Sequence, residues 1–309
     1  MRLNQDGLET LLAVCDEQSF TRAAARLQVT TGAVSQRIAA LERAVGHPVV
    51  DRGQPPLPTA VGRELLRLAR QSLLLHQETA ARLGDVLHAA EPRIRVALAV
   101  NADSLSTWFQ PVVAGLARRG DLLLDLRIAD QDRTADLLRS GSVLAAVTTE
   151  SEPGPGCRSE WLGSMRYLPV CAPSLAPPRG RSLADHLGRT AMLQFDSLDR
   201  LPLQFLDQVG ATDVPPAHFV PSNREYFDAV RLGLGWSVLP EGQVGQALTD
   251  GDLVLLDRRR HVDVGLWWQR WRIDSSTIDE VTTAVRAAAR DGLRGRPGRG
   301  SSEGQPPPR

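Results

Sequence analysis

The chain has 309 residues, of which 42% are hydrophobic, and its 36 basic residues balance its 36 acidic residues. This length exceeds one average domain, so we expect two or three domains, each with enough apolar residues for a core. The balanced charge gives no sign of a nucleic-acid partner by itself. No apolar run approaches the roughly 18 residues of a membrane span, and the N-terminus is too polar for a signal peptide. The three widely spaced cysteines argue against a disulfide frame or a zinc site and for a reducing, cytoplasmic location.

Residues 1–58 are predicted to form short helices followed by a proline-rich turn. Small and apolar residues recur at helical spacing in 19–27 and again in 30–45, and the break between them is short. The later helix carries hydroxyl, amide and guanidinium groups opposite its apolar stripe, as a helix that reads the major groove must. Thr30 and Thr31 can bind phosphate at its start. The expected DNA-contacting residues are Ser19, Thr21, Thr30, Thr31, Ala33, Ser35, Gln36, Arg37 and Arg52.

The alternative for this segment is a set of packed helices without a DNA partner. Six arginines and six acidic residues lie in 1–58, so the segment has no net charge. Strong nonspecific DNA binding normally needs a basic face. The acids can, however, lie away from the DNA, and the charge balance therefore leaves DNA binding open.

Residues 59–90 are predicted to form one long helix. Positions 61, 65, 68, 72, 75, 79, 82 and 86 alternate by four and three, as in a heptad seam with polar interruptions. A solitary helix of this length would expose the seam, so we expect a partner helix from a second copy of the chain.

After Pro92 apolar strands alternate with helical segments, which is typical of an α/β domain with a mainly parallel sheet. The expected strands are 94–100, 122–129, 143–149, 166–172, 191–195, 217–221, 235–239, 253–256 and 262–268. The Gly/Pro/Arg/Ser-rich tail, residues 293–309, is expected to be disordered.

The turn after the first of these strands, Asn101 to Ser104, has three interpretations. It is a helix cap, a site for a ligand carboxylate, or a nucleophilic serine site. Ligands bind at the carboxyl ends of strands in open α/β sheets, which favours the second. The third lacks a G-x-S-x-G context and a His/Asp partner set, so no catalytic residue is assigned.

The stretch SFTRAAARLQVTTGAVSQRIAALERAVG resembles the winged helix-turn-helix of LysR-type transcriptional regulators. The resemblance implies an all-α winged helix-turn-helix domain at 1–58 and a dimerising linker helix at 59–90. It also implies an α/β effector domain with two lobes like a periplasmic binding protein, lobe 1 at 91–163 and 265–292 and lobe 2 at 164–264. Promoter or operator DNA, a second copy in a homodimer or homotetramer, and RNA polymerase are the implied partners, with no membrane.

Shorter strings, among them NADSLSTWF, RLGLGWSVLPE and WWQRWR, resemble the branch of this family that senses basic amino acids, including the lysine-export regulators and their arginine-responsive relatives. The branch implies L-lysine or L-arginine as effector, no cofactor or metal, and a basic-amino-acid exporter gene as target. The effector residues that it implies are Asn101, Ser104, Leu105, Asp130, Thr148, Thr149, Glu150, Ser222 and Asn223. The alternatives are a regulator with another effector, a redox-sensing regulator, a small-molecule-binding protein without DNA function, and an enzyme that uses the cleft between the lobes.

Overall fold

The computed structural model describes residues 3–51, 53–87, 93–128 and 131–295. The chain divides into two compact units. The first contains Met1–Ala102, Pro111–Trp161 and Trp267–Val285, and the second contains Asp103–Gln110, Leu162–Leu266 and Arg286–Arg309. The strands β6 (Cys157–Cys171) and β11 (Val262–Trp271) run from one unit into the other.

The first unit opens with three short helices and a small wing. The elements are α1 (Gln5–Glu17), α2 (Phe20–Leu27), α3 (Thr31–Val45), β1 (Val50–Asp51) and β2 (Leu57–Pro58). β1 and β2 pair antiparallel, with Val50 opposite Pro58. Apolar side chains from all three helices form one buried cluster, because each helix directs an apolar stripe inward.

The long helix α4 (Ala60–Leu87) follows the wing. Leu65, Leu66 and Ala69 join the apolar cluster of α1–α3. Leu68, Leu75 and Leu83 are exposed by 43, 39 and 54%. The predicted heptad seam is therefore divided, since its beginning is buried within the chain while Leu68 and Leu75 remain on the surface.

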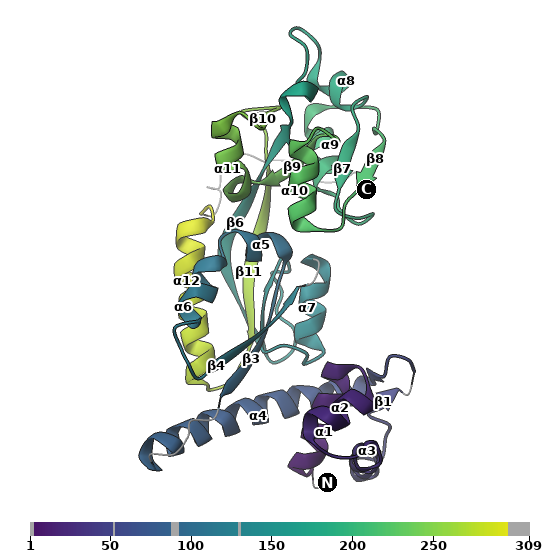
Figure 1. Cartoon of the computed structure of the whole chain (residues 1–309), viewed down its shortest axis with the longest axis vertical. Helices are drawn as coiled ribbons and strands as arrows, with labels where there is room; N and C mark the ends of the chain where they lie inside the picture. The colour runs from purple at the N-terminus through teal and green to yellow at the C-terminus, as the bar shows by residue number, and fades with distance from the viewer. Residues whose placement is uncertain (1–2, 52, 88–92, 129–130, 296–309) are drawn as a thin grey trace, which may run out of the picture. The chain divides into compact units, whose positions relative to one another are not determined.

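The remainder of the first unit is an α/β sandwich. It contains β3 (Ile94–Val100), β4 (Leu122–Ile128), β5 (Ala145–Thr148), α6 (Gln110–Leu116), α7 (Gln131–Arg139) and most of α12 (Ser276–Gly292). Figure 1 shows α6 and α12 on one side of the strands and α7 on the other. Ala97 and Ala99 of β3 pack with Leu138 of α7, whereas Trp268 of β11 donates a hydrogen bond of 3.1 Å to Thr282 of α12.

The main sheet has seven strands and is mixed rather than mainly parallel, contrary to the sequence prediction. Its order is β10-β6-β11-β5-β3-β4, with β9 also paired to β6. β3 pairs parallel with β4 and β5, but β11–β5, β6–β9 and β6–β10 are antiparallel. In these antiparallel pairs the long strands β6 and β11 run in the opposite direction to the strands beside them. The alternation of helices and strands in the sequence does not reveal this direction.

The second unit contains short strands and helices. They are α5 (Ala102–Ser106), η1 (Pro173–Leu175), α8 (Leu183–Leu187), β7 (Met192–Gln194), α9 (Leu201–Val209), β8 (Ala217–Phe219), α10 (Asn223–Arg231), β9 (Ser237–Pro240), α11 (Glu241–Asp250) and β10 (Val254–Leu255). β7 and β8 form a separate parallel pair. The apolar core of the second unit includes Val170, Leu193, Val230 and Val244.

Each of the nine strands predicted after Pro92 overlaps an observed strand; the first has the bounds of β3, and the other eight differ at one or both ends. The predicted tail begins too early, because the backbone of Leu293 bonds to Ala289 and Arg294 pairs with Ser164. Residues 296–309 lie outside the described residues. Among the helices of the described residues, none is long and apolar enough to cross a membrane.

Candidate functional site

The first candidate site is the surface around α2 and α3. Each helix begins with a side-chain cap: Ser19 Oγ accepts from the backbone N–H of Arg22 at 3.3 Å, and Thr30 Oγ1 accepts from that of Ala33 at 3.1 Å. Gln28 ends α2 in the left-handed region at φ 55°. The tight break between the helices predicted from sequence is thus built by one cap on each side.

The predicted DNA-contacting side chains of α3 lie mostly on its solvent side. Val34, Ile38 and Leu41 are buried on the opposite face. Exposed members of the predicted set are Thr21, Thr30, Thr31, Ser35 and Gln36, and partly buried members are Ser19, Ala33 and Arg37.

Arg37 and Arg52 are the two members of the predicted set with charged side chains. Arg37 forms an ion pair with Asp6 of α1, with Nη2 and Oδ2 3.5 Å apart. The guanidinium that is expected to contact DNA therefore also forms an ion pair with an acidic side chain of the same domain. Arg52 lies outside the described residues.

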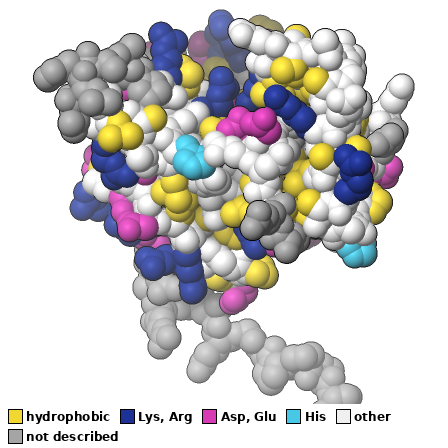
Figure 2. Space-filling model, turned by 90° about the horizontal axis from the view of Figure 1, so that it is seen from below, with side chains coloured by type: hydrophobic (Ala, Val, Ile, Leu, Met, Phe, Trp, Pro, Cys, Tyr) yellow, Lys and Arg dark blue, Asp and Glu magenta, His cyan; other side chains and the backbone are white. Residues whose placement is uncertain are grey.

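A groove with a volume of about 520 Å³ adjoins this face. The start of α2, the outer side of α3 and the wing line it, through Gln18, Ser19, Phe20, Ser35, Gly53, Gln54, Pro55 and Pro56. Its lining mixes polar groups that can bond to a nucleic-acid backbone with the apolar Phe20, Pro55 and Pro56, and none of the described lining residues is ionised. Figure 2 shows arginine side chains on this side of the molecule separated by acidic and uncharged surface, in keeping with the charge balance of residues 1–58.

The second candidate site surrounds the turn that follows β3. Asn101 and Ser104 are buried and Leu105 is partly buried. The Asp103 side chain does not cap α5. Its carboxylate instead accepts a hydrogen bond of 2.8 Å from Tyr167 Oη and one of 2.9 Å from Asn223 Nδ2. Of the three interpretations of this turn, the cap is therefore not made by Asp103.

Asp103 interacts with a second partly buried acid, Asp199. The Asp199 carboxylate accepts backbone hydrogen bonds of 3.0 Å from Phe195 and from Leu201. Burial raises the pKa of both carboxyls, and the charge of Asp199 raises that of Asp103 further. Among the described residues neither acid forms an ion pair, so the local field favours a bound cation.

Asn223, which was predicted from sequence, has a second role in this cluster. Its Oδ1 accepts a bond of 3.2 Å from Gln243 Nε2 while its Nδ2 holds Asp103. Asp103, Tyr167, Asp199 and Gln243 were missed as site residues. Asp103 lies within the turn Asn101 to Ser104 that the sequence singles out, and nothing local in the sequence marks the other three.

The remaining predicted effector residues are distributed over both units. In the first unit Thr148 is buried and its Oγ1 accepts from the backbone of Glu150 at 3.1 Å, while Thr149 is partly buried. The Glu150 carboxylate is 2.8 Å from Arg139 Nη1, so its charge is already paired. In the second unit Ser222 donates to Glu225. Asp130 lies outside the described residues.

Comparison with known proteins places both sites in a family context. Residues 5–63 match the family described as "Bacterial regulatory helix-turn-helix protein, lysR family", and residues 89–290 match the "LysR substrate binding domain". The chain is 44% identical over 299 residues to the lysine export transcriptional regulatory protein LysG of Corynebacterium efficiens, covering 94% of this chain and 100% of that protein.

Two solved structures are similar over most of the chain. ArgP from Mycobacterium tuberculosis is 41% identical with a TM-score of 0.79, covering 96% of this chain and 100% of that one. Full-length LysG from Corynebacterium glutamicum with bound effector arginine is 39% identical with a TM-score of 0.73, covering 94% of this chain and 100% of that one.

Proposed function

This chain belongs to the LysR family of bacterial helix-turn-helix regulators, and from that premise we propose that it is a DNA-binding regulator whose effector is a basic amino acid, L-arginine or L-lysine. Its relatives are transcriptional regulators, in agreement with the prediction of a regulator and not an enzyme. Ser104 therefore has no catalytic role to fill.

The observation that carries the effector proposal is the partly buried carboxylate of Asp103. It is fixed from two sides by Tyr167 and Asn223, and burial and a neighbouring acid raise its pKa. Such a carboxylate is costly to ionise until a cation binds it. The ammonium or guanidinium of a basic amino acid supplies that cation, while a neutral amino acid side chain does not.

Names of relatives support the same class of effector. One relative is named a regulator of lysine export, and another contains arginine as its effector. The polar residues Ser104 and Asn101 remain our proposed contacts for the effector's carboxylate and ammonium. The proposed target is a basic-amino-acid exporter gene, with RNA polymerase as a further partner in the cytoplasm.

The exposed leucines of α4 support a homodimer as the DNA-binding form. Leu68 and Leu75 are one heptad apart on the surface of a 28-residue helix. A parallel or antiparallel partner helix from a second copy would cover them. Two recognition helices in one particle match an operator with two half-sites.

The test is fluorescence polarisation with full-length protein and the DNA upstream of its own gene, at two salt concentrations. Titrations contain L-arginine, L-lysine, or citrulline, which has arginine's shape without its positive charge. The proposal predicts specific binding that arginine or lysine changes and citrulline does not. Specific binding that is indifferent to both cations would reject the effector class and keep the regulator. An equal response to citrulline would show that charge is not what the site recognises.

A further inference from the structure

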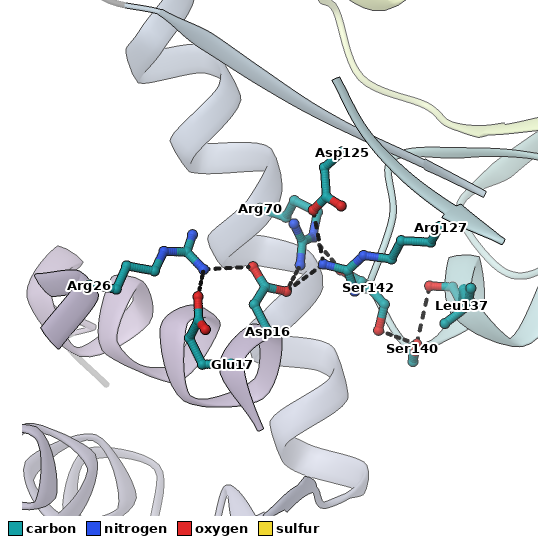
Figure 3. A network of polar contacts seen from close by, with 10 residues as sticks. Asp16, Glu17, Arg26, Arg70, Asp125, Arg127, Leu137, Ser140 and Ser142 are labelled. Atoms are coloured by element: carbon teal, nitrogen blue, oxygen red, sulfur yellow. Dashed lines mark hydrogen bonds and ion pairs between the residues drawn. The ribbon is translucent and has the colours of Figure 1, made fainter. Parts of the chain in front are cut away.

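A cluster of charged side chains joins α1, α4 and β4 within the first unit (Figure 3). Asp16 Oδ1 lies 2.7 Å from Arg70 Nη2 of α4 and 2.7 Å from Arg127 Nη2 of β4. Its other oxygen, Oδ2, is 3.4 Å from Arg26 Nη1 of α2. One carboxylate therefore bonds to side chains from three other elements, 10, 54 and 111 residues away in the chain.

The centre of this cluster is buried. The side chains of Asp16 and Arg70 are only 9 and 7% exposed, while that of Arg127 is 24% exposed. Burial raises the pKa of the Asp16 carboxyl, but the guanidinium groups of Arg70 and Arg127 outweigh burial and bring the pKa below its usual value. Asp16 is consequently ionised at neutral pH. It is the counter-charge of the buried Arg70, while Arg127 pairs both with Asp16 and, at 3.2 Å, with Asp125 of its own strand.

The linker helix α4 is fixed closely along the effector lobe. Arg70 Nε donates to the carbonyl of Gly141 at 2.8 Å. Gly141 has a φ of 71°, and a Cβ there would lie 2.6 Å from the backbone nitrogen of Arg67, so only glycine permits this approach. Further along α4, Glu78 accepts from the Ser275 hydroxyl at 2.6 Å and the Thr277 backbone at 2.9 Å.

The contact between α1 and β4 is an ion pair at the edge of the buried cluster. α1 packs on α2, α3 and α4, and the polar link to β4 that joins it to the sheet is the ion pair between Asp16 and Arg127. An ion pair that is partly open to water can break and re-form without exposing a hydrophobic core. It is thus suited to a reversible contact between the winged helix-turn-helix and the effector lobe.

Arg127 is also paired in the sheet with the strand that leads into the effector turn. It is the last residue but one of β4, and it lies opposite Ala99 in the parallel register with β3. β3 continues two residues later into Asn101 at the start of the effector turn. A shift of this sheet edge on effector binding would therefore move the partner of Asp16.

We propose that Asp16, Arg70 and Arg127 form a latch that sets the orientation of the DNA-binding domain on its own effector lobe and transmits the effector signal to it. The regulatory part of this inference rests on the proposed function. The latch leaves Thr31, Ser35 and Gln36 exposed, so it orients the reading face without covering it. When the latch opens, the distance between the two recognition helices of a dimer is no longer fixed.

The test compares full-length Arg127→Gln with Arg119→Gln. Arg119 pairs with Asp121 and Glu280 inside the effector lobe, so its replacement removes the same charge without touching the latch. Operator affinity is measured on DNA with two half-sites and on DNA with one, with and without arginine and lysine. Circular dichroism first establishes that both variants fold.

The latch predicts that Arg127→Gln binds the single half-site normally and loses at least about five-fold on the paired site, a loss at the lower end of measured couplings between sites. The variant also loses its response to the effector, and Arg119→Gln retains both properties. Unchanged paired-site affinity in Arg127→Gln, or equal losses in the two variants, would overturn the latch. If the unmodified protein ignores both amino acids, the effector proposal fails, while the ratio of paired-site to single-site affinity still decides the latch.

Discussion

The side-chain amide of Asn223 holds the carboxylate of Asp103 at 2.9 Å, which joins the first residue of α10 to α5 across 120 residues of sequence. Gln243 and Tyr167 complete the arrangement by bonding to Asn223 and to Asp103. An acid that accepts from two neutral donors, with a raised pKa, is poised for a positively charged ligand.

Replacement of Asp103 by asparagine is expected to abolish recognition of the cation. The variant should bind arginine and lysine at least about 100-fold more weakly, because a buried charge that loses its partner typically costs about 3–5 kcal/mol. Without effector it should unfold at a higher temperature than the unmodified protein at neutral pH, because an acid that is costly to ionise has been removed. Calorimetric titration and thermal unfolding measure the two effects.

The control for this variant is Asp207→Asn, which removes an exposed acid from α9 of the same unit. It should leave both affinity and stability nearly unchanged. Wild-type affinity for arginine in Asp103→Asn would show that the cation binds elsewhere.

Effector binding is expected to strengthen as pH rises through the pKa of Asp103. The folded protein holds this proton to a higher pH than the unfolded chain, whose aspartates titrate near about 3.9. Through this group the effector-free fold therefore loses stability as pH rises between the two pKa values. A cationic effector binds the ionised form, so its affinity increases over the same interval. Titrations of arginine from acid to neutral pH test this, and Asp103→Asn should flatten the profile.

The helical DNA-binding segment could be predicted from sequence in detail, because its signals are local. Ser19 and Thr30 both cap helices, and the apolar stripe of α3 is buried as its spacing requires. The alternation of strands and helices after Pro92 could be predicted from the sequence equally well. The direction of the strands could not be predicted, because β6 and β11 pair with strands that lie far away in the sequence.

The effector site was predictable only in part, for the same physical reason. The turn after β3 was identified because a strand end before a polar turn is a local pattern. Glu150, which was predicted as an effector residue, also pairs with Arg139 of α7, and no local sequence pattern reveals this contact. Asp103 gains its importance from Tyr167, Asp199 and Asn223, which folding alone brings together.

The cysteines are expected to be unreactive in the folded protein. Burial raises the pKa of the Cys15 thiol to about 12 and those of Cys157 and Cys171 to about 11. Thiolate is the reactive form, so little of it exists at neutral pH. A thiol-reactive dye should label the native protein slowly and all three cysteines after denaturation. Fast labelling, or a change of operator affinity with mild oxidant, would favour a redox-sensing regulator instead.

Charge on the exposed seam of α4 is expected to separate the dimer. The double variant Leu68→Glu/Leu75→Glu places like charges where two α4 helices would meet, which opposes association. Sedimentation at micromolar concentration should show a monomer that still unfolds cooperatively. Leu198→Glu, at a leucine that is 70% exposed in the second unit, is the control and should stay associated as the unmodified protein does. A dimeric double variant would place the interface elsewhere.

Loss of the Gln36 amide is expected to weaken operator binding and to relax its sequence specificity. Gln36 is exposed on the outer face of α3, where an amide can pair with an adenine edge in the major groove. Gln36→Ala should lose about 1–3 kcal/mol on the operator while its affinity for random DNA stays the same, because phosphate contacts are untouched. Gln5→Ala is the matched control, since Gln5 bonds to Glu9 within α1. An equal loss on operator and random DNA would instead assign Gln36 to the phosphate backbone, and the salt dependence of binding would then fall as well.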